Sequence, residues 1–180
     1  AYTSMSDAEI EDAYFDYIQY LMGQFNPNYL VAGIEVNELY IHSPEKWEGY
    51  KALMQNVIMR IRAEHPNLEI SESMTLHNLY LPDIDNQTDY LEEMTGYINA
   101  MDFVAISFYP FFKNLHTQND FQGAFDFLHD RVNRPIAFVE TCTIAEEVID
   151  LDRLWRDTGL LDEAGDERLA WNTWGGYFTR

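Results

Sequence analysis

Strand-like and helix-like segments alternate along this chain, and this alternation restricts the fold more than any other feature. Three short apolar segments, each consistent with a buried strand, occupy residues 29–37, 102–108 and 135–140, and residues 68–74 alternate between apolar and polar as a half-buried strand does. The segments with apolar residues at helical spacing occupy residues 6–22, 43–65, 89–100 and 120–132. Successive strands begin about 35 residues apart, as in strand–helix units. The alternation predicts a parallel sheet with right-handed crossovers.

The number of expected strands decides between two α/β architectures. A closed eight-stranded (β/α) barrel typically takes ~250 residues, and this chain has 180. We therefore expect residues 1–180 to form one domain, a partial (β/α)8 TIM barrel whose first strands and last strand are missing. A small doubly wound sheet is the alternative, and the lack of a glycine-rich phosphate turn favours the barrel.

The charge balance excludes some classes of partner. There are 31 acidic and 11 basic residues, and the formal net charge is −20. Such a chain offers no basic surface for nucleic acid or an anionic membrane, and no apolar run is as long as a membrane span. The composition favours a neutral or cationic ligand. A single cysteine excludes an internal disulfide.

Two of the apolar segments have a glutamate at their C-terminal end. Glu38 comes after the first segment, and Glu140 ends the last one. The C-terminal ends of parallel strands meet at one edge of the sheet, where barrel enzymes hold their catalytic groups. A retaining glycosidase needs two carboxyl groups ~5–5.5 Å apart, one to protonate the leaving oxygen and one to attack the anomeric carbon. The pair therefore predicts glycoside hydrolysis, whereas either glutamate alone is consistent with a surface residue of an acidic protein.

Three strand endings resemble those of clan A glycoside hydrolases. Asn37-Glu38 looks like the Asn-Glu that ends the fourth strand of that clan, and Val139-Glu140-Thr141 resembles the seventh-strand ending that carries the nucleophile. The segment 107–112, Ser-Phe-Tyr-Pro-Phe-Phe, is similar to the sixth-strand Ser-Tyr-Tyr-Pro-Phe-Trp of glycoside hydrolase family 53, the endo-β-1,4-galactanases. The resemblance implies that the chain covers roughly strands 4 to 7 of the barrel.

The resemblance also implies roles for individual residues. Glu38 would be the general acid/base, protonated until it donates to the leaving oxygen, and Glu140 would be the ionised nucleophile. Asn37 would hydrogen-bond the sugar 2-hydroxyl, and Tyr109 would hydrogen-bond Glu140 and orient it. The implied substrate is a plant or microbial β-glycan cleaved by double displacement, and a secreted or periplasmic location is favoured.

Some positions depart from the family pattern or lie outside it. Phe108 and Phe112 stand where the family has Tyr and Trp, and Cys142 stands where Gly or Ala is more usual. These departures bear on sugar stacking and leave the substrate open. His77 lies in an expected strand-to-helix loop on the same edge, where it could contact sugar. No histidine pair has zinc-ligand spacing, so neither a metal nor a cofactor is expected.

Other interpretations remain open. Glu35 is a rival carboxylate on the first strand, expected to lie deeper and to have a structural role. A Schiff-base aldolase would need a lysine at a strand end, but Lys46 and Lys51 fall in a helix and Lys113 in a loop. The main alternative to an enzyme is an inactive barrel that binds carbohydrate. The sequence does not define an oligomeric state.

Overall fold

The computed structural model describes residues 4–5 and 7–141. The chain divides into two compact units, residues 1–141 and 142–180, so every described residue belongs to the first unit. Cys142 lies outside the described residues, as do two segments, 148–156 and 166–180, where apolar spacing in the sequence suggests further helices.

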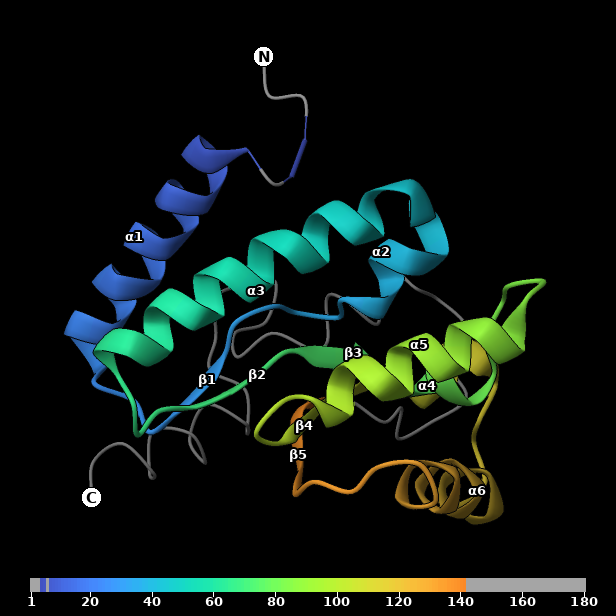
Figure 1. Ribbon diagram of the computed structural model, residues 1–180. Coiled ribbons are helices and arrows are strands. Elements are labelled where there is room, and N and C mark those ends of the chain that lie inside the picture. Colours follow the sequence, from blue (N-terminus) through green and yellow to red (C-terminus); the bar gives the residue numbers. More distant parts are fainter. Residues whose placement is uncertain (1–3, 6, 142–180) are drawn as a thin grey trace, which may run out of the picture. The chain divides into compact units, whose positions relative to one another are not determined.

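Helices and strands alternate along the described chain (Figure 1). The α-helices are α1 (Ala8–Phe25), α2 (Asn37–His42), α3 (Trp47–Glu64), α4 (Leu76–Tyr80), α5 (Gln87–Asn99) and α6 (Gln118–His129). The strands are β1 (Tyr29–Val31), β2 (Glu69–Ser71), β3 (Ser73–Thr75), β4 (Val104–Phe108) and β5 (Ile136–Thr141). Two 3-10 helices, η1 (Pro44–Lys46) and η2 (Pro110–Lys113), follow α2 and β4. None of the helices in this part of the chain is long and apolar enough to cross a membrane.

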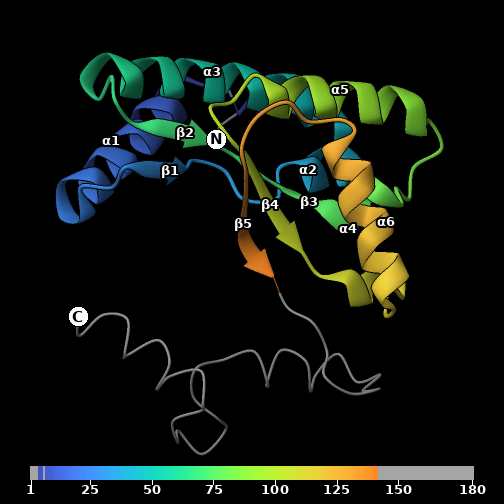
Figure 2. The same ribbon diagram turned by 90° about the horizontal axis from the view of Figure 1, so that it is seen from below.

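All the strands pair in parallel, and their order in space follows their order in the chain. β1 pairs with β2, and β3, β4 and β5 form a second sheet in that order. β2 and β3 are consecutive pieces of one segment, separated by Glu72 alone. Helices α3 and α5 lie along the same side of the strands, as Figure 2 shows. The predicted α/β class is confirmed, and the arrangement is that of part of a (β/α)8 barrel.

The first strand is shorter than the expected 29–37, because the chain bulges before it reaches the helix. The carbonyl of Gly33 accepts a hydrogen bond from the Ser73 N–H at 2.8 Å, and the Val36 N–H donates to the Ser73 carbonyl at 2.9 Å. Two residues therefore loop out of the ladder, and one of them, Glu35, has a left-handed φ of 53°. The expected strand ending is wrong: β1 ends at Val31, and Asn37 and Glu38 begin α2.

A second irregularity lies in β5. Phe138 pairs with Ile106, but the next pair joins Ser107 to Glu140, so Val139 is an extra residue. Paired residues of parallel strands point to the same face, and one extra residue reverses the alternation beyond it. The bulge therefore turns Glu140 to the face of Ser107. A regular strand would have turned it to the face of Ile106.

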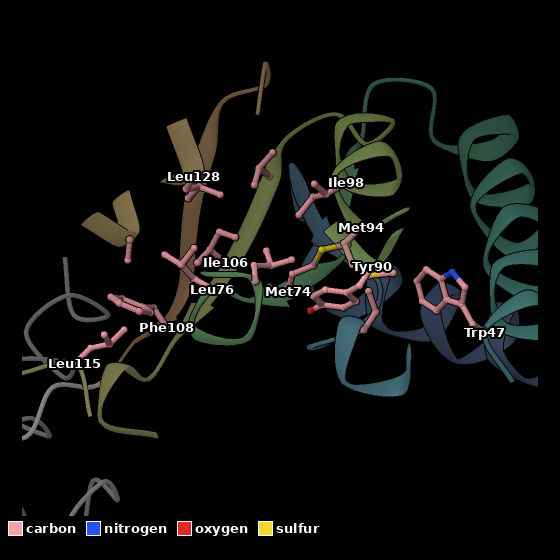
Figure 3. Packing of buried hydrophobic residues seen from close by; sticks show 14 residues of the cluster. Trp47, Met74, Leu76, Tyr90, Met94, Ile98, Ile106, Phe108, Leu115 and Leu128 are labelled. Carbon is pink, nitrogen blue, oxygen red and sulfur yellow. The ribbon is translucent and has the colours of Figure 1, made fainter. Parts of the chain in front are cut away.

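The two faces of the sheet differ in chemistry. The face toward the helices is apolar, and Figure 3 shows Met74 beside Tyr90 and Met94 of α5, and Ile106 beside Leu76 and Leu128. Complete burial of such side chains contributes ~1.5–3 kcal/mol each. The opposite face, here called the inner face, carries small buried polar residues, namely Ser71, Ser73, Thr75 and Ser107. A second apolar cluster joins α1, α3 and β2.

Most helix boundaries agree with the expected ones. Pro44 lies at the start of η1, and α3 begins after it and ends just before His65. Helix α6 begins at a capping box in which Thr117 and Asp120 bond each other's backbone N–H groups. The short helix α4 was not expected, and it places residues beyond β3 at the C-terminal edge of the strands.

Candidate active site

Glu38 lies in the first turn of α2, and polar neighbours hold its carboxyl group. Its Oε1 accepts hydrogen bonds from the Thr75 hydroxyl and from Asn78 Nδ2, the latter at 2.7 Å. Its Oε2 lies 3.3 Å from Nε2 of His42. The side chain is 26% exposed. Two donors therefore fix Oε1, and Oε2 faces the His42 imidazole.

Asn37, next to this glutamate, is completely enclosed. Its Nδ2 donates to the Thr75 hydroxyl at 2.8 Å and to the Tyr90 hydroxyl at 2.9 Å, and its Oδ1 accepts from the Thr75 N–H at 2.8 Å. The residue is 0% exposed. In this arrangement the amide ties α2 to β3 and α5. The sugar contact expected of Asn37 stays a prediction.

Glu140, near the end of β5, lies beside the residue expected to orient it. The Tyr109 hydroxyl donates a hydrogen bond to Oε2 of Glu140 at 2.9 Å. Tyr109 follows β4 directly, and Ser107 of the same strand pairs with Glu140. A hydrogen bond to a carboxylate is stronger than one between neutral groups. The contact fixes the direction in which the Glu140 carboxyl group points.

Glu35 supplies a third carboxyl group at the C-terminal edge of the strands. Glu35 is only partly buried, so the deep position expected for it is wrong. Burial raises the pKa of Glu35, the charges of Glu140 and Glu38 raise it further, and a hydrogen bond from Ser107 opposes them. Because Glu35 interacts with both of the other carboxyl groups, the three are gathered at one edge of the strands.

His77 lies in α4 and is nearly enclosed, with 4% exposure. Its ring contacts those of Tyr109 and Phe112, with centroids 6.5 and 5.6 Å away. Burial lowers the pKa of His77 to about 4, the Glu38 charge opposes this shift, and the Lys113 charge adds to it. The imidazole is therefore neutral at pH 7. Its Nδ1 has no hydrogen-bond partner within the described chain, and its sugar contact stays a prediction.

The two phenylalanines that depart from the family pattern differ in environment. Phe108 is 3% exposed, and its ring packs against Phe121 and Phe125 of α6. It is therefore a core residue. Phe112 is 44% exposed and lies beside Tyr109. Of the two, Phe112 is the ring that a sugar can reach.

Other chemistries find less support in this part of the chain. Within residues 4–5 and 7–141, no group of three or more His, Cys, Asp or Glu side chains could hold a metal ion. Lys51 is paired with Glu48 and Glu93, and Lys113 is paired with Asp83. Ion-paired ammonium groups are poor Schiff-base nucleophiles, which need a neutral amine.

Sequence reasoning missed the side chains that hold Glu38. Thr75 ends β3 and Asn78 lies in α4, and both reach the first carboxyl group. A usable signal was present, because polar residues just beyond a parallel strand lie at the catalytic edge of a barrel. His77, beyond the same strand, was expected at this edge, whereas Thr75 and Asn78 were not.

Parallel strands in barrel order, with carboxyl groups at their C-terminal edge, form the kind of arrangement on which barrel glycoside hydrolases rely. The model of glycosyl hydrolase family 53 matches residues 2–154. The chain belongs to glycosyl hydrolase family 53, as the three strand endings had indicated. Comparisons with curated proteins and with solved structures give no significant match.

Proposed function

We propose that this protein is a retaining glycoside hydrolase that cleaves β-glycosidic bonds of a polysaccharide or oligosaccharide by double displacement. The observation that carries the proposal is the Tyr109–Glu140 hydrogen bond, at an edge where Glu38 is also held by polar neighbours. Residues 1–180 would act as one partial barrel domain. Membership in family 53 favours a β-1,4-galactan as the substrate.

In the first step, the Glu140 carboxylate attacks the anomeric carbon while the bond to the leaving oxygen breaks. Glu38 gives its proton to that oxygen, and a glycosyl ester of Glu140 forms. In the second step, water attacks the same carbon, Glu38 takes a proton from the water, and the ester bond breaks. The sugar leaves with its original anomeric configuration, and both glutamates return to their starting states.

Substrate contacts follow from the surroundings of the two glutamates. Phe112 offers an exposed ring on which a sugar can stack, beside the tyrosine that orients the nucleophile. The neutral His77 can exchange hydrogen bonds with sugar hydroxyls without adding charge. Asn37 would reach the 2-hydroxyl of the sugar only if its bond to Thr75 or Tyr90 opened.

The direct test compares the unaltered protein with Glu140→Gln on a soluble β-1,4-galactan, by release of reducing ends. We expect hydrolysis by the unaltered protein and a loss of at least about a thousandfold in the variant. Calorimetric binding of a galactan oligosaccharide should be retained, because the amide keeps the shape of the side chain. Glu64→Gln, at an exposed glutamate ending α3, is the matched control and should hydrolyse normally.

A second candidate is a barrel that binds carbohydrate without cleaving it. The enclosure of Asn37 favours this alternative, because its amide is fully engaged within the protein. In that case the unaltered protein would bind galactan oligosaccharides without releasing reducing ends. Glu140→Gln would then change neither the binding of the oligosaccharide nor the release of reducing ends.

A further inference from the structure

We propose that Thr75 and Asn78 are positioning residues of the acid/base glutamate, because they hold Oε1 of Glu38 as an acceptor and leave Oε2 to carry the proton. The inference rests on the proposed function, since it concerns the group that protonates the leaving oxygen. It also gives Asn37 a role within the protein, as the residue that sets the direction of the Thr75 hydroxyl.

The hydrogen bonds that lead to Glu38 have only one consistent set of directions. The Thr75 N–H can only donate, and it does so to Oδ1 of Asn37 at 2.8 Å. The other end of that amide is therefore the NH2 group, which donates to the Thr75 hydroxyl at 2.8 Å and to the Tyr90 hydroxyl at 2.9 Å. Because the Thr75 hydroxyl oxygen accepts this bond, its own hydrogen is directed to Oε1 of Glu38. Asn37 and Thr75 are 0% and 2% exposed, so neighbouring protein groups decide these directions.

Asn78 supplies the second donor to the same oxygen, from helix α4. Its Nδ2 donates to Oε1 of Glu38 at 2.7 Å, and an amide NH2 group does not accept hydrogen bonds. With a donor on each side, Oε1 can accept but cannot donate. A neutral Glu38 therefore carries its proton on Oε2, which lies 3.3 Å from Nε2 of His42. The side chain of His42 is 73% exposed, so this oxygen is on the side of the carboxyl group that a substrate can approach.

Holding one oxygen from two elements fixes the plane of the carboxyl group. One donor ends β3 and the other lies in α4, so the carboxyl group of Glu38 cannot exchange its oxygens without breaking both bonds. Catalytic groups depend strongly on such fixed geometry. The titratable groups that interact with Glu38 are His42, His77 and Glu35. The two donors to Oε1 do not titrate, so they hold it at every pH at which the chain is folded.

The leaving group of the substrate separates a positioning role from a merely structural one. An aryl β-galactobioside with an acidic phenol, such as dinitrophenol, needs little protonation, whereas one with a weakly acidic phenol needs the general acid. Asn78→Leu keeps a branched side chain and removes the amide. Its kcat/KM, which covers only the first bond cleavage, should fall ~10–100-fold on the substrate with the weakly acidic phenol and less than about threefold on the dinitrophenyl substrate. Equal losses on both substrates, or no loss on either, would overturn the inference.

The same substrate pair tests Thr75 and provides a matched control. Thr75→Val removes the hydroxyl and should show the pattern of Asn78→Leu, whereas Thr75→Ser keeps the hydroxyl and should restore both rates. Asn56 also donates its amide to a glutamate, Oε2 of Glu11 at 3.0 Å, but on the exposed surface of α3. Asn56→Leu should therefore leave both rates unchanged. A Thr75→Ser variant as impaired as Thr75→Val would contradict the role of the hydroxyl.

A readout that does not need catalysis is the NMR signal of the Asn78 side-chain NH2 group, followed from about pH 3 to pH 9. The signal should shift as Glu38 titrates, and Glu38→Gln should abolish this shift. At the acid end it should stay displaced from that of a free amide, because Oε1 remains an acceptor when Oε2 carries the proton. A signal that ignored Glu38, or that returned to the free value in acid, would overturn the inference. If the unaltered protein hydrolysed no glycan, the proposed function would fail, and this titration would still decide how Glu38 is held.

Discussion

Replacement of Glu72 by glutamine should make the folded chain more stable at neutral pH and leave its stability nearly unchanged in acid. Glu72 lies between β2 and β3 with 1% exposure. Its Oε2 accepts a hydrogen bond from the Tyr97 hydroxyl at 2.7 Å, while Oε1 is buried with no partner among the described residues. Burial raises the pKa of Glu72 to about 7, although bonds from Tyr97 and Tyr50 oppose the shift.

The size of the stability change follows from the difference between the pKa of Glu72 in the folded chain and in the unfolded chain. Below the ordinary pKa of 4.5, Glu72 is protonated in both the folded and the unfolded chain, and no penalty exists. Between 4.5 and about 7, the unfolded chain loses the proton and the folded chain keeps it, so stability falls as pH rises. Two and a half units at 1.36 kcal/mol each give a penalty of about 3 kcal/mol above pH 7. Glutamine does not ionise and carries no such penalty.

Urea denaturation of both proteins between pH 4 and 8 measures the effect. The free energy of unfolding of Glu72→Gln minus that of the unaltered protein should rise by about 2–3 kcal/mol across this range. Glu64→Gln removes a carboxyl group that is exposed in the folded chain, and its difference should stay nearly flat. A difference for Glu72→Gln that did not vary with pH would refute the reasoning, whatever its absolute size.

Three further predictions concern single contacts. Tyr109→Phe removes the donor to Glu140 and should lower kcat on galactan ~10–100-fold with a smaller change in KM, since a hydrogen bond to a charged group contributes ~1.5–3 kcal/mol; an unchanged kcat would contradict the orienting role. Gly33→Ala places a Cβ against the Tyr50 hydroxyl and 2.9 Å from Cγ1 of Val36 and should cost ~1–3 kcal/mol in urea denaturation, whereas a neutral effect would contradict the claim that this space is closed. Thr117→Ala removes the capping hydroxyl of α6 and should cost ~1 kcal/mol, and a loss below about 0.3 kcal/mol would contradict this estimate.

The spacing of apolar residues predicted the alternation of helices and strands, because each of these elements is defined by a long apolar pattern. The helices around Trp47 and Tyr90 and the strand around Ile106 all follow from side-chain spacing. The parallel pairing follows from the same alternation. Misreading the pattern at one position does not change these predictions, because many residues contribute to each element.

The bulges could not be predicted in this way. Whether Val139 is an extra residue depends on pairing with a strand about thirty residues away, and the local pattern is the same with or without it. The extra residue nevertheless decides which face Glu140 points to. The left-handed turn at Glu35 also depends on Ser73, from another strand. The sequence thus indicated two glutamates near strand ends, and tertiary hydrogen bonding decided how they are presented.

The central claim is that Glu140 forms a covalent bond with the sugar, and trapping that bond tests it most directly. A 2-deoxy-2-fluoro galactoside with a good leaving group slows the second step more than the first, so the glycosyl ester should accumulate. Mass spectrometry of the digested protein should find one added fluorosugar on the peptide that contains Glu140, and none after Glu140→Gln. An unlabelled protein that still hydrolyses galactan, or a label on Glu38 or Glu35, would contradict the account.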